Sequence, residues 1–349
     1  MNRPWLCHSR PGDDLPFVRR FKPREIEAAT SGFSTALETG GPRGTAYRAR
    51  FADGLVATVR RVAGGDRDHD HQEQHGAFYR ELQLLGRLNH RHVVRLRGFS
   101  EGHNRFLVFD QMENRSLKEC LHDPLRTPLN WRTRLQVAID VAAALEYLYY
   151  FCDPPVFHVT VNSSSVMMDA DFVAKLSDVS VVAHESTQES EGSQRIQQRR
   201  TELVFQYGVL LLELVTGQSP GGGDGELVQW VQEPGFAGSM QRMVDADLGG
   251  TYDAGELRDL VIVARLCTRP GNGSAVVSIP QITSLLYLLR VNAKQCDDLP
   301  FMRRFKPREI EVATSGFSMA LEIGGPHGTA YGAHFVDGIV ATVRRDHQE

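Results

Sequence analysis

The sequence has few cysteines, and none of them shows a paired spacing. The five cysteines in 349 residues are scattered at Cys7, Cys120, Cys152, Cys267 and Cys296. An odd number of isolated cysteines argues against a disulfide framework or a zinc site. The pattern is typical of a protein kept in a reducing compartment.

Long apolar runs are also lacking. The first residues contain no apolar stretch of the kind found in a secretory leader. The most apolar stretch, Val204 to Thr216, contains Gln206 and Glu213 and is too short to cross a bilayer. This stretch is therefore predicted to be a buried helix, and we expect a cytoplasmic protein without a membrane span.

An excess of positive charge is missing as well. The formal net charge is −4, whereas nucleic-acid binding usually leaves a basic footprint, so no nucleic-acid partner is expected. Hydrophobic residues at 41% and charged residues at 23% are ordinary globular values and exclude wholesale disorder. The length suits one large two-lobed domain plus a fragment.

An internal repeat links the two ends of the chain. Residues 13–61 recur as residues 297–345 with nine substitutions in 49 positions, and residues 346–349 repeat residues 70–73. Solenoid units occur in contiguous runs of three or more, so two distant copies do not form a solenoid. We interpret residues 297–349 as a truncated repeat of residues 13–73.

The apolar pattern changes along the chain from strands to helices. Short apolar stretches flank Asp53-Gly54, a dipeptide that favours a β-hairpin. Residues 77–88 have apolar side chains at helical spacing, and the chain after Trp131, including residues 135–149, is mostly helical in pattern. Strands followed by helices predict an α+β protein with a small sheet lobe and a helical lobe.

Two motifs in the helical half contain candidate functional residues. Residues 157–165 read FHVTVNSSS and residues 175–180 read KLSDVS. They resemble the catalytic loop and metal-binding motif of plant receptor-like serine/threonine protein kinases, which read His-Arg-Asp-Ile-Lys-Ser-Ser-Asn and Lys-Leu-Ser-Asp-Phe-Gly. The similarity covers about residues 21–290, and residues 106–117 (FLVFDQMENRSL) and 207–217 (YGVLLLELVTG) are among its most specific stretches.

The resemblance implies a bilobal protein-kinase-like fold: a small antiparallel sheet lobe with one long helix, and a larger, mostly helical lobe. It implies an extension at 1–20 and a kinase-like domain at 21–290. The first lobe is expected at about 33–112 and the second at about 113–290, followed by the partial duplicate of the first lobe at 297–349. We expect the first copy, not the duplicate, to occupy the core position beside the helix around Glu81.

The resemblance also implies that the catalytic chemistry is damaged. Thr160 stands where the family has the Asp that accepts the substrate proton, so no catalytic residue is intact. Ser165 replaces the metal-binding Asn, and Asp178 keeps the metal-binding Asp. One carboxylate and one neutral hydroxyl would form at most a weak Mg²⁺ site. The alternative is that Asp178 is a solvated loop acid.

The ATP site is degenerate in the same way. The three glycine positions of the phosphate loop are Thr39, Gly41 and Gly44, and the alternative is an ordinary hairpin turn. Arg60 replaces the strand lysine; it is expected to pair with Glu81, unless it is a plain surface residue. ATP and Mg²⁺ are therefore expected to bind weakly at most.

The segment after Asp178 is shorter than in the family and lacks its Gly-Thr-Pro-Gly-Tyr and Pro-Glu sequences. Residues 186–194 (STQESEGSQ) are polar and expected to be mobile. The next helix normally opens with an Asp that ties down the catalytic loop, and Leu203 stands there. The surface that holds a peptide substrate is therefore predicted to be missing.

Three functions remain open. The first is a pseudokinase that acts as an interaction or regulatory module, with protein partners that include other kinases. The second is a weak ATP-binding serine/threonine kinase that transfers the γ-phosphate to protein hydroxyls. The third is a decayed gene product without function, which the truncated repeat favours.

Overall fold

The computed structural model describes residues 17–41, 44–62, 71–102, 104–180, 189–219, 225–269, 277–292, 307–315, 317–318, 320–325, 328–334 and 340–345. The chain divides into two compact units, Met1–Arg290 and Val291–Glu349. Within the described ranges, no helix is both long enough and apolar enough to cross a membrane.

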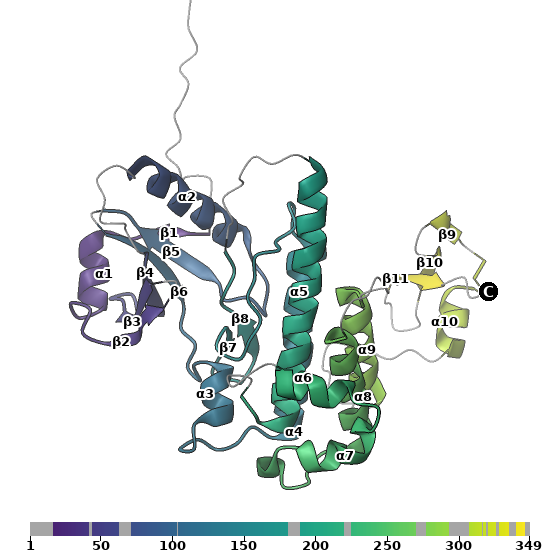
Figure 1. Cartoon of the computed structure of the whole chain (residues 1–349). Coiled ribbons are helices and arrows are strands. Elements are labelled where there is room, and N and C mark those ends of the chain that lie inside the picture. Colours follow the sequence, from purple (N-terminus) through teal and green to yellow (C-terminus); the bar gives the residue numbers. More distant parts are fainter. Residues whose placement is uncertain are drawn as a thin grey trace, which may run out of the picture. The chain divides into compact units, whose positions relative to one another are not determined.

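The first unit begins with strands and continues with helices (Figure 1). Its strands are β1 (Arg19–Arg20), β2 (Ala36–Gly41), β3 (Gly44–Arg50), β4 (Val56–Val62), β5 (Leu96–Ser100), β6 (Arg105–Asp110), β7 (Val166–Met168) and β8 (Ala174–Leu176). Its helices are α1 (Pro23–Ala29), α2 (His71–Arg87), α3 (Leu117–His122), α4 (Trp131–Glu146), α5 (Glu189–Thr216), α6 (Gly225–Gln232), α7 (Phe236–Met243), α8 (Ala254–Cys267) and α9 (Ile279–Asn292). A π-helical turn, Tyr147–Phe151, continues α4, and a short 3₁₀ helix spans Ala246–Leu248.

The smaller lobe is a six-stranded sheet with the order β1-β5-β6-β4-β3-β2. The Asp53-Gly54 hairpin joins β3 to β4, and Gly54 has a φ of +87°, which suits a residue without Cβ. The sheet with its helices and the mostly helical second lobe confirm the bilobal α+β fold predicted from the sequence. The residue limits assigned to the two lobes stay predictions.

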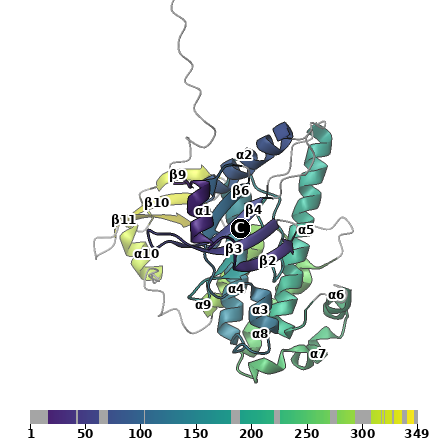
Figure 2. The ribbon, with the colours of Figure 1, turned by 90° about the vertical axis from the view of Figure 1, so that its left-hand side faces the viewer.

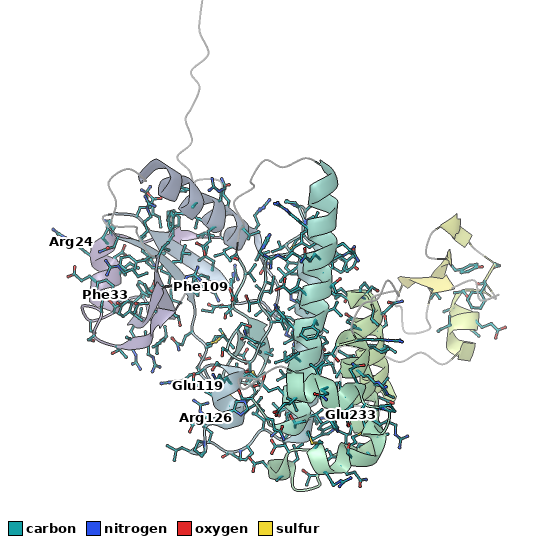
Figure 3. The ribbon with its side chains drawn as sticks, in the orientation of Figure 1. Arg24, Phe33, Phe109, Glu119, Arg126 and Glu233 are labelled. Carbon is teal, nitrogen blue, oxygen red and sulfur yellow. The ribbon has the colours of Figure 1, made fainter. Side chains whose placement is uncertain are left out.

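Helices cover both faces of the sheet, because successive side chains of a strand point to opposite faces. Phe106 and Val108 of β6 pack in one cluster with Ile26 of α1, whereas Leu107 packs in the cluster that contains Leu82 of α2. Figure 2 shows α1 in front of the strands. Phe33, labelled in Figure 3, stacks on Phe106 with 5.3 Å between ring centroids.

The sequence predicted an antiparallel sheet, but one pair of strands in it is parallel. β1 pairs in parallel with β5, where Arg19 lies beside Gly98. A Cβ at Gly98 would lie 2.2 Å from the backbone oxygen of Arg19, so only glycine allows this approach. Gly98 therefore lets the segment before α1 join the sheet.

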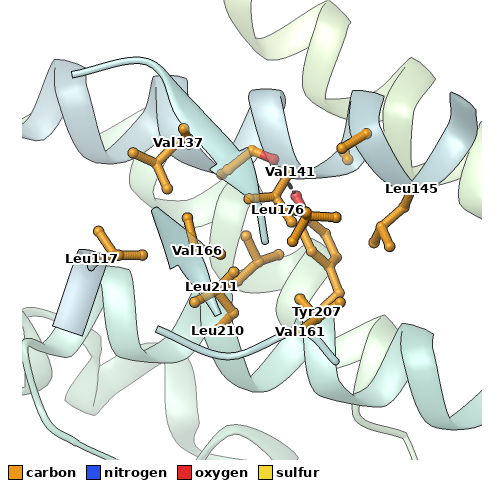
Figure 4. Packing of buried hydrophobic residues seen from close by; sticks show 14 of the residues in the cluster. Leu117, Val137, Val141, Leu145, Val161, Val166, Leu176, Tyr207, Leu210 and Leu211 are labelled. Atoms are coloured by element: carbon orange, nitrogen blue, oxygen red, sulfur yellow. Dashed lines mark hydrogen bonds between the residues drawn. The ribbon is translucent and has the colours of Figure 1, made fainter. Parts of the chain in front are cut away.

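The larger lobe is built around α5. The Tyr207 hydroxyl donates to the backbone oxygen of Ala138 in α4 at 2.8 Å, and the buried side chains around it are shown in Figure 4. Gly208 allows α5 to approach α8, because a Cβ there would lie 2.6 Å from the Cβ of Cys267. This close packing fixes the helix that lies beneath the catalytic-loop motif.

Helix α5 is longer than the sequence suggested. The stretch from Val204 to Thr216 was expected to be helical, but the helix runs from Glu189 to Thr216. Residues 189–194, expected to be mobile, form its first turns, while residues 181–188 lie outside the described part. Glu, Gln and Arg are good helix formers, and their propensity favours continuing a helix that is already nucleated by the buried half.

The second unit contains one helix, α10 (Pro307–Ala313), and one sheet in its described part. The sheet has the order β11-β10-β9, with β9 (Ala320–Gly325), β10 (Gly328–His334) and β11 (Val340–Arg345). Its turn after α10 repeats the turn after α1: Ser31 and Ser315 both have a φ of 51°. That the unit is a duplicated lobe stays a prediction. The first copy supplies β2, β3 and β4 of the six-stranded sheet, as expected.

Candidate functional site

The two motif segments lie side by side. A β-bridge joins Val159 to Val179, the Thr160 amide donates to the backbone oxygen of Asp178 at 3.1 Å, and the Ser180 amide donates to the backbone oxygen of His158 at 2.9 Å. The backbone thus brings Thr160 and Asp178 together in the manner expected of a catalytic loop and its metal-binding motif.

Strand β8, which leads into Asp178, is held by a buried polar network. The Asp140 carboxylate accepts a hydrogen bond from the Ala174 amide at 3.1 Å, and Nδ1 of His92 lies 3.1 Å from the Ala174 oxygen. Burial lowers the pKa of His92 to about 4, so the imidazole is neutral near pH 7 and its Nδ1–H donates to that oxygen. Nε2 of His92 also lies 3.5 Å from Oδ1 of Asp140, so the two side chains together hold the strand that leads into the motif.

Thr160 offers no proton acceptor of the required kind. Its side chain is a neutral hydroxyl that is half-buried, in place of a carboxylate. A general base must take up the proton of the attacking hydroxyl near the working pH, which a threonine hydroxyl does not do. The structure therefore places a residue at the base position that cannot serve as the base.

The Ser165 hydroxyl is engaged within its own loop. It donates to the Thr160 backbone oxygen at 2.7 Å, with the Asn162 backbone oxygen 3.0 Å away, and its oxygen accepts from the Asn162 backbone amide at 3.0 Å. The side chain is buried, with 2% of its surface exposed. The Ser165 side chain is thus bonded to the backbone of its own loop. Within the described ranges, no cluster of three His, Cys, Asp or Glu side chains could hold a metal ion. The weak Mg²⁺ site at Asp178 and Ser165 stays a prediction.

The catalytic loop is tied to α5 by a residue that the sequence did not reveal. The Val161 amide donates to Oε1 of Gln206 at 2.9 Å. Leu203, which stands at the position of the family's tethering Asp, is instead buried in the core. Residues three apart lie on the same side of a helix, so Gln206 reaches the loop from the same face. The catalytic loop is therefore still bonded to α5, through the neutral side chain of Gln206 in place of an Asp.

Replacing Gln206 with alanine should loosen the catalytic loop. The Val161 amide would lose its partner, and a buried unsatisfied donor costs about 1–3 kcal/mol. Urea denaturation should show a loss of stability of this size, and hydrogen exchange at residues 160–162 should accelerate. Gln197→Ala, on the exposed part of the same helix, is the control and should change neither. Unaltered exchange at residues 160–162 in Gln206→Ala would contradict the assignment.

Arg60 and Glu81 form the ion pair expected from the sequence. Nη2 of Arg60 in β4 lies 2.5 Å from Oε1 of Glu81 in α2, and the side chains are 12% and 23% exposed. The guanidinium also lies over the ring of Phe109, 5.1 Å from its centroid; Figure 3 labels Phe109 on the smaller lobe. Arg60 is therefore held on both sides and is not a plain surface residue.

The guanidinium fits this position imperfectly. Nε of Arg60 is buried and has no hydrogen-bond partner in the described part of the chain. A lysine ammonium would present three rotatable donors at one point, whereas the planar fork directs its donors along fixed lines. Arg60 thus keeps the charge and the link to α2 but leaves one donor without an acceptor.

The glycine positions flank the connection between β2 and β3. Gly41 ends β2 opposite Gly44, the first residue of β3. Gly44 has a φ of +89°, a conformation that favours glycine. Pro42 and Arg43 lie outside the described residues. This geometry fits a hairpin turn as well as a phosphate loop, so both interpretations of Gly41 and Gly44 stay open.

A family model for protein tyrosine and serine/threonine kinases matches residues 55–237. A probable receptor-like protein kinase of Arabidopsis thaliana is 39% identical over 298 residues, which cover 78% of this chain and 44% of the relative. The receptor-like serine/threonine-protein kinase ALE2 of the same plant is 31% identical over 299 residues, covering 76% of this chain and 38% of the relative. The chain spans less than half the length of these relatives.

Solved pseudokinase structures share the fold. The pseudokinase DRIK1, drought responsive inactive kinase 1, superposes with a TM-score of 0.65 and 21% identity, covering 78% of this chain and 97% of that one. The pseudokinase domain of BIR2, an immune regulator of the RLK/Pelle family, superposes with a TM-score of 0.62 and 26% identity. The match covers 77% of this chain and 84% of that one. With its two lobes and the aligned motif segments, this chain belongs to the protein kinase family and has plant receptor-like kinases as relatives.

Proposed function

We propose that this chain is a catalytically impaired protein-kinase-like domain that acts as a regulatory or interaction module. The observation that carries the proposal is the course of the chain after Asp178. Only residues 181–188 separate Ser180 from the first turn of α5, which then continues unbroken to Thr216. A kinase needs a longer segment here to hold the peptide substrate, and one continuous helix takes its place.

The residues present fit the reaction poorly. Kinase domains use ATP and Mg²⁺, with one carboxylate as proton acceptor and an Asp and an Asn on the metals. Thr160 supplies no carboxylate, and the Ser165 hydroxyl is bonded into its own loop. The remaining acid, Asp178, supports at most weak binding of Mg²⁺, which prefers six oxygen ligands. These residues therefore do not support phosphoryl transfer by this chain.

A protein partner is the kind of ligand we propose. The lobes keep a continuous buried core and the Arg60–Glu81 pair that connects α2 to the sheet. Such a domain retains a defined surface although its chemistry is impaired, and BIR2, which shares its fold, is described as an immune regulator. Other kinases are the partner class that the family resemblance favours.

A thermal-shift titration with ATP tests the proposal. A ligand present at 100 times its Kd stabilises a protein by about 2.7 kcal/mol, which raises the Tm of a domain this large by several degrees. We expect one cooperative melt and a shift below about 1 °C with millimolar ATP, both with and without Mg²⁺. A shift of several degrees that requires Mg²⁺ would contradict the proposal.

The second candidate function is a weak kinase, favoured by the observed Arg60–Glu81 pair. In that case the Mg²⁺-dependent shift should appear and should disappear in Asp178→Ala. A chain without any cooperative melt would instead support the decayed gene product. The three outcomes are therefore distinguished by one measurement and one variant.

A further inference from the structure

The sheet of the second unit has one edge, along β11, that no described strand covers. Within the described part of that unit, β11 pairs with β10 alone, from Thr329 opposite Arg345 to His334 opposite Val340. The other edge of β11 therefore presents a row of backbone donors and acceptors that no described strand satisfies. Such an edge is a template for pairing with another extended chain.

The first unit shows which strand pairs with the matching edge of β4. Residues 340–345 and residues 56–61 have the same sequence, VATVRR. In the first unit the corresponding edge of β4 pairs with β6 in antiparallel register, from Ala57 opposite Asp110 to Val62 opposite Arg105. An identical strand in a matching hairpin thus already has an observed partner, with a defined direction and register.

Among the residues that the structure describes, two core positions beneath α10 are less buried than their counterparts in the first unit. Val59 and Ile26 are fully buried in the first unit, whereas their counterparts Val343 and Ile310 are only partly buried. The local geometry of the two copies matches: the ring centroids of Phe33 and Tyr47 lie 5.1 Å apart, as do those of Phe317 and Tyr331. The first copy is completed by Phe106 and Val108 of β6, and the second unit has no described strand in that place.

We propose that the open edge of β11 binds one extended segment of a partner protein with the pattern of β6. Backbone hydrogen bonds along β11 would provide affinity, as in other cases of strand addition. Large apolar side chains at alternate positions, like Phe106 and Val108, would enter the space under α10 and provide specificity. A small sheet covered by one short helix is marginal in water, so binding would also order the unit.

A second copy of this chain is a poorer occupant. Its own strand of this pattern, β6, is paired on one side with β4 and on the other with β5. Exchanging β4 for β11 would break one pairing and form an identical one, so nothing would offset the entropic cost of association. The observations therefore favour a free segment of another protein.

The test uses the full chain and a fluorescent peptide with the sequence of residues 104–111 (NRFLVFDQ). We expect saturable binding by fluorescence anisotropy, and at least tenfold weaker binding for a peptide with aspartate in place of Phe106 and Val108. The unaltered chain is used for both peptides, so a folding defect cannot explain the difference. Hydrogen exchange should slow at residues 340–345 and stay unchanged at residues 56–61.

Two chain variants complete the test. Val343→Asp should weaken peptide binding at least tenfold, whereas Val312→Asp should leave it unchanged, because Val312 is 70% exposed on α10. Equal binding of both peptides, or no saturation, would overturn the proposal. So would new protection at residues 56–61, which would show strand exchange in the first unit. A stable dimer with residues 340–345 already protected would assign the edge to a second copy instead.

Discussion

Incubation of the purified chain with ATP, Mg²⁺ and peptide substrates should give no phosphate transfer above the background without protein. A positioned general base contributes roughly 10²–10⁴-fold to such a reaction, and Thr160 cannot supply it. The unbroken helix α5 (Glu189–Thr216) removes the longer segment that would position a peptide, and loss of positioning compounds the effect. A radiolabel assay measures the result.

The control for this prediction is Asp178→Ala, which removes the one remaining metal-binding carboxylate of the motif. Turnover by the unaltered chain that disappears in this variant would show that the chain is an active kinase. Restoring the base alone, with Thr160→Asp, should not produce activity. Ser165 would still be bonded to its own loop, and α5 would still replace the substrate-binding segment.

Replacing Arg134 with methionine should lower the stability of the chain more than replacing Gln206 or Arg132 with alanine. The Arg134 side chain is 1% exposed; it donates to the backbone oxygens of Leu129 and Leu214 at 2.9 and 3.1 Å and pairs with Asp245 at 2.7 Å. Removing one partner of a buried ion pair costs about 3–5 kcal/mol, because the other charge stays uncompensated. Urea unfolding followed by tryptophan fluorescence should show this loss.

Two further variants separate the ion pair from general disturbance of α4. Arg132→Ala changes an exposed neighbour on the same helix and should alter stability by less than about 0.5 kcal/mol. Combining Arg134→Met with Asp245→Leu should recover much of the loss, since no charge is then left without its partner. Equal stability of Arg134→Met and the unaltered chain would show that the pair does not hold α4, α5 and the Asp245 segment together.

Local sequence patterns predicted the hairpin and the main helices of the fold. The Asp53-Gly54 turn, the helical spacing of residues 77–88 and the apolar stretch ending at Thr216 each correspond to an observed hairpin or helix. Residues 135–149 were expected to be helical, and they lie in α4 and in the π-helical turn that continues it. Turn residues and apolar periodicity act over a few neighbouring positions, so they can be read without knowing the rest of the structure.

The sequence predicted which residues occupy the motif positions of the candidate site. It did not predict the contacts that these residues make with other parts of the chain. The substitutions at Thr160, Ser165 and Arg60 are visible in the sequence, and so is the pairing of Arg60 with Glu81. The engagement of Ser165 by its own loop is not, because it depends on the backbone path from Thr160 to Asn162. Residues 189–194 became helical because the buried part of α5 extends its helix into them.

The sequence by itself thus determined the family, the two lobes, the repeated segment and the loss of the catalytic base. Only the tertiary structure decided that Gln206 in place of Leu203 holds the catalytic loop, and that Phe109 lies beneath Arg60. It also decided that β11 has no second neighbour among the described strands, whereas β4, which has the same sequence over residues 56–61, is covered by β6. Identical residues acquire different roles because a strand's partners are set by which elements fold beside it.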